Sequence, residues 1–244
     1  MLHYFVRVNR SDNFLDVKIE DFLMKLFNVA VDGPSGAGKS TISDVIAQKY
    51  HLIPLDTGAM YRAIALALHE QNVPASYNET FQQALDAIEL SMDNGKVVVN
   101  GVDLTNKIRE PHVSALASQY SALPQVRKKL VALQQQIASK QGYILDGRDI
   151  CDVVLPDAKI KIYLDASVES RAKRRMLQDL EKGIQVPYST VLKAIQDRDY
   201  ADRTRKTDPL TISKQATVID SSNLTFDETV AKIVDLIENT LKDE

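Results

Sequence analysis

Residues 33–40, with the sequence GPSGAGKS, have the residue types and spacing of a phosphate-binding loop. Glycines let the backbone adopt positive φ and approach an anion closely, so that successive N–H groups point at phosphate oxygens. Lys39 adds a positive charge for the β- and γ-phosphates, and the Ser40 hydroxyl is a ligand for Mg²⁺. We therefore expect a nucleoside triphosphate and Mg²⁺ to bind at Gly33, Pro34, Ser35, Gly36, Ala37, Gly38, Lys39, Ser40 and Thr41.

The loop alone is compatible with a GTPase switch, a motor ATPase, a regulator or a kinase. The chain lacks a guanine-reading Asn-Lys-x-Asp motif, because its Asn-Lys pair at 106–107 continues as Ile-Arg. After the segment ILDG it carries Arg148 where a motor ATPase would place a second acid. A kinase for a phosphate monoester needs arginines and Mg²⁺ rather than a general base, since its acceptor is already anionic. We therefore interpret Asp32 as support for the loop rather than as a catalytic base.

Arginines of the required kind follow the expected strands. Arg62 lies in DTGAMYR, Arg148 in LDGRD, and Arg198 and Arg205 in RDYADRTR. Ligands of an open parallel sheet bind at the carboxyl ends of its strands, so Arg62 and Arg148 are expected at the same edge as Lys39. The pattern favours a small-molecule kinase, with a non-catalytic nucleotide-binding regulator as the alternative from another class.

Short apolar runs that alternate with helical segments position these residues. Strands are expected at 27–32, 52–56, 142–146, 160–165 and 216–220. Helices are expected after the first two strands, after Ser167 as an N-cap, and after a capping box formed by Thr225 and Glu228. This alternation predicts an α/β fold with a parallel five-stranded sheet that helices cover on both faces.

Residues 88–105 break the alternation. They contain Asn94-Gly95 and Asn100-Gly101, two hairpin signals that flank the segment KVVV, and so predict a three-stranded antiparallel meander. Two helical runs follow, and each opens with a proline, a residue favoured at the first helical position. We expect residues 73–140 to form an insertion between the second and third strands of the main sheet.

Composition limits the partners. Of the 244 residues, 44% are hydrophobic and 26% are charged, which is ordinary for a soluble globular protein. The net charge of −3 gives no electrostatic reason to expect nucleic acid or an anionic membrane as a partner. Cys151 is the only cysteine, which excludes an internal disulfide and indicates a reducing, cytoplasmic compartment. For Cys151 itself we favour a buried, inert thiol over a redox sensor. We expect small-molecule substrates and a monomer.

Residues 1–26 are expected to be an extension that precedes a kinase domain at 27–244. This extension starts apolar but breaks at Arg7 and has no small-residue cleavage site, so it is no signal peptide. It is either a short element packed on the surface or a segment that precedes the natural start at Met24. The intact mass of the native protein distinguishes the two.

Six motifs resemble those of bacterial cytidylate kinases, a family of nucleoside-monophosphate kinases. They occur in the family's order within residues 27–241 and read DGPSGAGKST, LDTGAMYRA, ASQYSALPQVR, ILDGRDICDVVLPDAKIKIYLDAS, RAKRRMLQ and RDYADRTR. The resemblance implies the sheet order 2-3-1-4-5 and Mg²⁺-assisted, in-line transfer of the ATP γ-phosphoryl group to CMP or dCMP. It also implies that the insertion binds the monophosphate and that residues 171–188 form a lid over ATP.

Roles at individual positions follow from the same resemblance. The acceptor CMP would contact Thr57, Arg62, Ser118, Arg127, Asp146, Arg148, Asp149, Arg198, Asp202 and Arg205. Of these, Thr57, Arg62 and Arg148 would hold the phosphate. Arg198 and Asp202 would meet the ribose hydroxyls, and Arg205 would reach a phosphate. The lid would contribute Arg171, Arg174 and Arg175 to ATP, and the catalytic charges would come from Lys39, Arg62, Arg148 and Arg205.

Ser118, Arg127 and Asp149 would read the cytosine edge. Cytosine presents an amino group where uracil presents an acceptor oxygen, so a carboxylate such as Asp149 favours cytosine. UMP and a coenzyme precursor remain alternative acceptors. The chain departs from the family at Cys151 and Asp152, where glycine and threonine are usual. A positive φ at Cys151 would be strained, and Asp152 would add negative charge beside the base reader.

Overall fold

The structure is a computed structural model that describes residues 27–93, 95–181 and 183–242. The expected N-terminal extension and the two explanations of Met24 lie outside the described residues.

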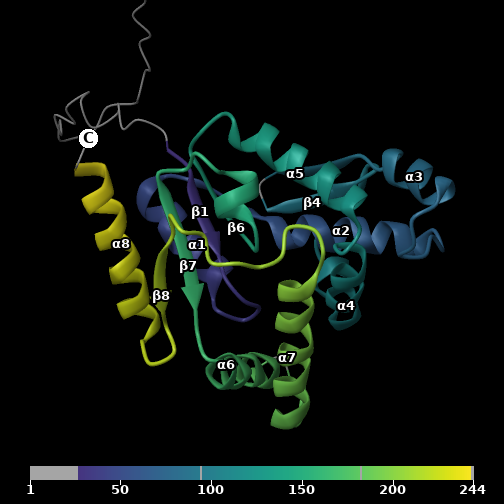
Figure 1. The fold of residues 1–244 in the computed structure, drawn as a ribbon. Helices are drawn as coiled ribbons and strands as arrows, with labels where there is room; N and C mark the ends of the chain where they lie inside the picture. The colour runs from purple at the N-terminus through teal and green to yellow at the C-terminus, as the bar shows by residue number, and fades with distance from the viewer. Residues whose placement is uncertain (1–26, 94, 182, 243–244) are drawn as a thin grey trace, which may run out of the picture.

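Five short strands form the main sheet of the described chain. They are β1 (Val29–Asp32), β2 (Ile53–Asp56), β6 (Tyr143–Gly147), β7 (Ile160–Asp165) and β8 (Thr217–Asp220). Their order is β2-β6-β1-β7-β8, and every neighbouring pair is parallel (Figure 1). Counted along the chain, the strands of this sheet follow the order 2-3-1-4-5, so the predicted topology is confirmed.

Helices cover both faces of this sheet because the apolar strand residues alternate between the faces. Val29 and Val31 pack with α1 (Lys39–Tyr50) and α8 (Phe226–Lys242), whereas Ala30 packs with α2 (Thr57–Glu70). All four residues of β1 are buried, as expected for the central strand of a covered parallel sheet. β1 thus ends deep in the molecule, where the glycine-rich loop begins.

The segment between α2 and β6 forms the predicted meander and helices. A helix α3 (Glu79–Asp86) precedes an antiparallel sheet of β3 (Leu90–Asp93), β4 (Lys96–Val99) and β5 (Val102–Asp103). The second hairpin turn has positive φ at Asn100 and Gly101 (49° and 79°), as a type I′ turn requires. Asn94 of the first turn lies outside the described residues. Two helices follow a short 3₁₀ turn, and each has its proline in the first turn: α4 (Pro111–Tyr120) and α5 (Pro124–Ala138).

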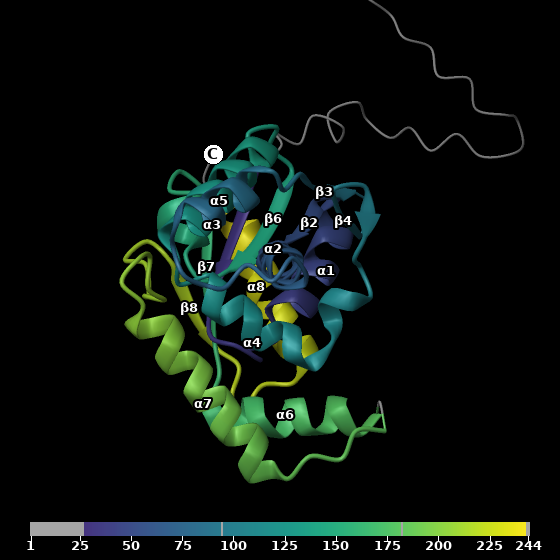
Figure 2. The same cartoon turned by 90° about the vertical axis from the view of Figure 1, so that its right-hand side faces the viewer.

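Two helices follow β7 and lie beyond its carboxyl end. They are α6 (Val168–Glu181) and α7 (Tyr188–Thr204), and Figure 1 shows them at the end of the sheet toward which the β7 arrow points. They pack on each other through Ala172, Val191 and Ile195, and the turned view in Figure 2 shows α7 beside α4. α7 is therefore placed between the P-loop edge of the sheet and the helices that follow the meander.

The predicted helix starts are confirmed. The Ser167 hydroxyl accepts a hydrogen bond from the Ser170 N–H at 3.2 Å, and the Thr225 hydroxyl accepts from the Glu228 N–H at 3.2 Å. Glu228 accepts in return from the Thr225 N–H at 2.8 Å, which completes the capping box. Within the described ranges, every helix is too short or too polar to cross a membrane.

Cys151 lies in a π-helical turn, Ile150–Val154, that follows β6 after two intervening residues. Its φ is not positive, so the strain expected from replacing a glycine does not arise. The thiol is buried near the carbonyl oxygens of Ala30 and Ile162, at 3.8 and 3.7 Å, and burial raises its pKa. The predicted burial of the thiol is confirmed, and its inertness stays a prediction.

Candidate active site

The phosphate-binding loop joins β1 to α1 and needs its glycines. Gly33, Gly36 and Gly38 all have positive φ, and a Cβ on Gly33 would lie 2.0 Å from the carbonyl oxygen of Leu164. The Nζ of Lys39 donates to the carbonyl oxygens of Gly33 and Pro34, at 2.8 and 2.9 Å. Burial lowers the pKa of Lys39, and the positive charge of Arg148 lowers it further. Arg148 at the end of β6 is therefore close enough to act electrostatically on the lysine of the loop.

Asp146 at the end of β6 faces the loop. Its Oδ2 accepts a hydrogen bond from Ser40 Oγ at 2.9 Å, and its backbone carbonyl accepts from Thr57 Oγ1 at 2.7 Å. Burial and the nearby Asp56 raise the pKa of Asp146, while Lys39 acts in the opposite direction. A hydroxyl and a carboxylate in contact are hard oxygen donors, so this pair fits Mg²⁺. Asp146 was expected to contact CMP; its side chain contacts Ser40 of the phosphate-binding loop, and the contact with CMP stays a prediction.

Three arginines lie around the carboxyl ends of β2 and β6. Arg62 pairs with Asp56 at 2.8 Å, and Arg148 Nε donates to Asp202 Oδ2 at 2.7 Å. The Nε of Arg198 is buried and has no hydrogen-bond partner within the described part of the chain. Burial lowers the pKa of Arg198 to about 10, with Arg148 and Arg62 contributing through like charge. A buried donor without a partner, close to two other guanidinium groups, suits a phosphate.

Arg127 on α5 is the centre of a second polar cluster. The residue is 1% exposed, and its guanidinium pairs with Asp149 Oδ2 through Nη2 and donates from Nε to Asp208 Oδ2 at 2.8 Å. It also lies 5.4 Å from the ring centroid of Tyr61, a cation–π arrangement. Burial lowers the pKa of Arg127, but Asp149, Tyr61 and Asp208 outweigh burial and raise it overall. The side chain is therefore a buried cation and not a solvated one.

Ser118 lies on α4 and is half-buried. Its carbonyl oxygen accepts from Ser121 Oγ at 3.1 Å, and the described contacts do not join its hydroxyl to Arg127 or Asp149. Its expected part in reading a base therefore stays a prediction.

Asp202 and Arg205 connect the two clusters. Asp202 pairs with Arg148 and lies 3.8 Å from Arg205, whose Nη2 is 4.0 Å from Asp149 Oδ1. Burial raises the pKa of Asp202, but Arg148, Arg198 and Arg205 lower it below its usual range. Asp202 is thus an ionised carboxylate that holds β6 and α7 together.

The three arginines expected in the lid have separate partners. Arg171 is buried, donates to the carbonyl oxygens of Ala166 and Ser35 at 2.8 and 2.9 Å, and pairs with Asp199 at 2.6 Å. The other two arginines are held on different sides of α6. Arg174 donates to Ser221 Oγ at 3.1 Å, and Arg175 pairs with Asp179 at 3.1 Å.

Asp32 supports a different loop from the one expected. Its two carboxylate oxygens accept from the backbone N–H groups of Ile150 and Cys151, at 2.9 and 2.8 Å. Burial raises its pKa, and those N–H groups act in the opposite direction. Asp32 therefore holds the turn after β6, next to Asp149, rather than the phosphate loop. The prediction that Asp32 has a structural role is correct, but the prediction that it supports the phosphate-binding loop is wrong.

Sequence reasoning missed Asp56, Tyr61 and Asp208. Asp56 could have been found, because it ends β2 at the functional edge of the sheet. Tyr61 could have been suspected, because it precedes Arg62 in the helix that leaves this edge. Asp208 lies in an irregular loop and gave no periodic signal.

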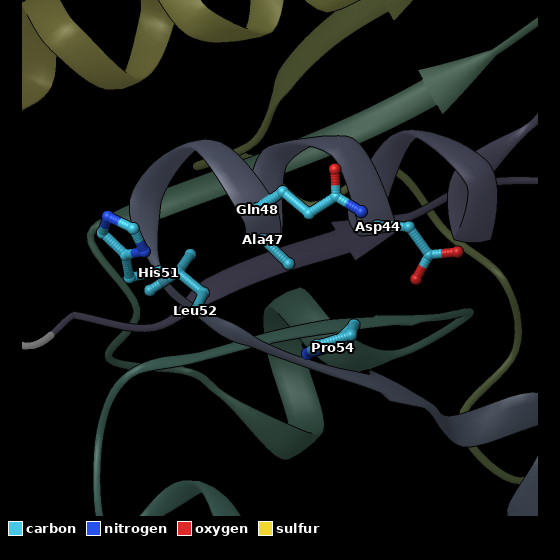
Figure 3. Close-up of a pocket in the computed structure, with 6 residues that line it drawn as sticks. All are labelled: Asp44, Ala47, Gln48, His51, Leu52 and Pro54. Atoms are coloured by element: carbon cyan, nitrogen blue, oxygen red, sulfur yellow. The ribbon is translucent and has the colours of Figure 1, made fainter. Parts of the chain in front are cut away.

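Two surface cavities lie apart from these clusters. The first, of about 500 Å³, is formed by α1 and the start of β2 and is lined by Asp44, Ala47, Gln48, His51, Leu52 and Pro54 (Figure 3). The second, of about 560 Å³, is lined by Asp152, Pro156, Lys161 and residues 211–215. Asp152 is exposed there, and neither Arg127 nor Asp149 lines this cavity. The negative charge of Asp152, which was expected beside Asp149, therefore lies on the surface at this cavity.

A phosphate-binding loop on a parallel sheet, with arginines at the same edge, defines the class of P-loop phosphotransferases. The family model described as "Cytidylate kinase" matches residues 29–239. The chain belongs to the cytidylate kinase family and is an ATP-dependent nucleoside-monophosphate kinase.

Curated relatives agree with this membership. A protein named cytidylate kinase from Caldicellulosiruptor saccharolyticus is 46% identical over 225 residues, which are 91% of this chain and 100% of that protein. One of the same name from Clostridium botulinum is 43% identical over 211 residues, 86% of this chain and 97% of that protein. Among solved structures, an uncharacterized protein from Eubacterium ventriosum has a TM-score of 0.50 at 12% identity, covering 87% of this chain and 98% of its own. That likeness concerns the fold alone.

Proposed function

We propose that this chain transfers the γ-phosphoryl group of ATP to CMP or dCMP and releases ADP with CDP or dCDP. The observation that carries the proposal is the arginine group beside the phosphate loop. Arg62 and Arg148 are held by Asp56 and Asp202 at the carboxyl ends of β2 and β6, and Arg198 has a buried Nε with no hydrogen-bond partner in the described part of the chain. A phosphate monoester placed among these three arginines would face the loop that holds the donor.

The donor would lie on the loop, with backbone N–H groups and Lys39 around the β- and γ-phosphates. Ser40 and Asp146, in contact at 2.9 Å, would hold Mg²⁺. When bound, Mg²⁺ neutralises charge between the β- and γ-phosphates. Lys39 is buried, and its charge acts more strongly on a phosphoryl group in a site that excludes water than it would in bulk water.

The acceptor phosphate would replace water among Arg62, Arg148 and Arg198. Arg62 and Arg148 are held by Asp56 and Asp202, so their guanidinium groups are oriented before the substrate arrives. Attack needs no general base, because the acceptor oxygen is already anionic at pH 7. Arg205 would neutralise charge at the same edge of the sheet. Closure of the segment 171–188 over ATP would exclude water and suppress hydrolysis.

The base would be read by Asp149 and Arg127. Oδ2 of Asp149 is bonded to Arg127, while Oδ1 has Arg205 at 4.0 Å and can accept from the cytosine amino group. With uracil, that oxygen would face a carbonyl lone pair, so the buried carboxylate would lose a hydrogen bond. All of these groups come from one chain, so the proposal needs no partner subunit.

A coupled assay of ADP release tests the proposal. ATP and Mg²⁺ are supplied with CMP, dCMP, UMP or AMP at equal concentration. We expect CMP and dCMP to give kcat/KM values at least about tenfold above those of UMP and AMP, in keeping with the loss of one buried hydrogen bond. Faster turnover of UMP or AMP would reject the assigned acceptor, and a lack of turnover with all four would reject the activity.

A further inference from the structure

Asp208 contacts two site arginines through two different groups. Its Oδ2 accepts from Arg127 Nε at 2.8 Å, and its backbone carbonyl accepts from Arg205 Nε at 2.7 Å and from Arg205 Nη2. The residue lies in the loop between α7 and β8 and has a left-handed backbone, with φ of 45°. One loop residue therefore joins the arginine on α5 to the arginine that follows α7.

We propose that Asp208 is a positioning residue that sets how tightly and how selectively the acceptor nucleotide is bound. Its carboxylate orients Arg127 toward the base, and its carbonyl orients Arg205 toward the phosphate. This inference rests on the proposed function, because it takes the cluster of Arg127 and Asp149 as the base-reading site.

The carboxylate matters because Arg127 is buried between two acids. Nη2 of Arg127 is paired with Asp149 and Nε with Asp208, so two contacts fix the orientation of the guanidinium plane. The directions of its remaining N–H groups are thereby fixed as well. Without Asp208, Asp149 would be, among the described residues, the one carboxylate still bonded to Arg127. Arg127 could then rotate and engage both oxygens of Asp149 in a bidentate pair, including the Oδ1 that the cytosine amino group needs. Loss of Asp208 should therefore weaken acceptor binding and reduce base discrimination together.

The contact with Arg205 depends on the backbone and not on the Asp208 side chain. A left-handed φ turns the carbonyl of Asp208 toward Arg205, and aspartate, asparagine and glycine adopt this conformation far more readily than β-branched residues. The two functions of Asp208 can therefore be separated by substitution. Asp208→Asn and Asp208→Gly keep the backbone and change the carboxylate, whereas Asp208→Val also disfavours the backbone.

The experiment measures steady-state kinetics of the full chain with CMP and with UMP at saturating ATP and Mg²⁺. For Asp208→Gly we expect the KM for CMP to rise about tenfold, the size of one lost charge-assisted hydrogen bond. For Asp208→Asn we expect a smaller rise, because the amide oxygen still accepts from Arg127 but carries no charge. We also expect kcat within about threefold of the parent, an unchanged KM for ATP, and a lower ratio of kcat/KM for CMP to that for UMP. Asp208→Val should show the same changes and a lower kcat, since Arg205 is also displaced.

The matched control is Asp197→Asn on α7. Asp197 is an exposed carboxylate that pairs with Lys193 at 2.8 Å, and its removal should leave all constants unchanged. Parent-like KM and CMP-to-UMP ratios in both Asp208→Asn and Asp208→Gly would overturn the inference, even if their melting temperatures fall. If the parent chain prefers another monophosphate, the proposed acceptor is wrong. The positioning role is then judged by the same KM shift with that acceptor.

Discussion

Arg148 and Asp202 form a partly buried ion pair, Nε to Oδ2 at 2.7 Å, that joins the end of β6 to α7. The pair fixes the guanidinium of Arg148 while Arg198, one turn earlier on the same helix, keeps a buried Nε without a partner in the described chain. The proposed acceptor site thus combines Arg148, whose guanidinium is already oriented, with Arg198, whose buried Nε can bind a phosphate oxygen.

Replacing Arg148 should abolish turnover and leave the fold intact. We expect Arg148→Ala to lower kcat by about 10³-fold, the lower end of what a phosphate-stabilising arginine contributes. Folding should survive because Asp202 keeps Arg205 at 3.8 Å and the charge of Arg198 nearby. Coupled kinetics and circular dichroism measure the two effects. Arg109→Ala, at an exposed arginine, is the control, and CMP-dependent ADP release at the parent rate in Arg148→Ala would refute the role.

Lys39 should be needed for chemistry but not for acceptor binding. Lys39→Ala removes the charge beside the β- and γ-phosphates, and we expect kcat to fall by about 10³-fold. Because the acceptor arginines are untouched, calorimetry should find CMP affinity within about threefold of the parent. Lys49→Ala removes an exposed lysine paired with Glu238 at 3.7 Å and should be neutral. Normal turnover by Lys39→Ala would contradict the assignment.

The activity should fall in acid because of Asp146. Burial raises the pKa of this carboxyl above its ordinary value of about 4, so it takes up a proton at a higher pH than an exposed acid. The protonated form cannot serve as an anionic ligand for Mg²⁺. We expect kcat/KM for Mg·ATP to decline as the pH falls through this raised pKa. The raised pKa also lowers the free energy of unfolding as the pH rises through it, because the folded protein binds this proton more tightly than the unfolded chain does.

Asp146→Asn supplies the control for this pH dependence. Its rate should be low, and it should lack the acid limb that the parent shows. Retention of an identical acid limb in Asp146→Asn would assign that limb to another group.

Arg171 and Arg175 lie on the same helix but should differ greatly in their contribution to stability. Arg171→Ala leaves the largely buried Asp199 without this partner and removes donors from two carbonyl oxygens, so we expect a loss of about 3 kcal/mol. Arg175→Ala breaks a half-exposed pair with Asp179 and should cost about 0.5 kcal/mol. Urea unfolding of the two variants measures both values. Equal losses would show that the contacts of Arg171 with the phosphate-binding loop and with α7 add no stability beyond that of an exposed pair.

Much of the fold could be predicted from local patterns. β7 was predicted with its observed ends, because an alternating-face apolar run stops sharply at Asp165. The Asn100-Gly101 turn was recognised because few residues tolerate its backbone. The rule for the carboxyl ends of parallel strands likewise brought Arg62 and Arg148 to the edge that holds Lys39.

The rest of the site depends on contacts between distant segments. Arg127 and Asp208 are 81 positions apart, and Arg171 and Ser35 are 136 apart. Their pairing requires the conformation of loops that carry no periodicity. The same limit explains the error at Asp32, whose partners in the turn after β6 lie 118 and 119 positions away.

The most direct test of the account follows the phosphoryl group itself. ATP labelled in its γ-phosphate is incubated with Mg²⁺ and either CMP or cytidine, and the labelled products are separated. The account predicts label in the β-phosphate of CDP with CMP and no labelled nucleotide with cytidine, since the acceptor phosphate is both the nucleophile and the group that the arginines hold. Label released only as inorganic phosphate, or transferred equally well to cytidine, would contradict it.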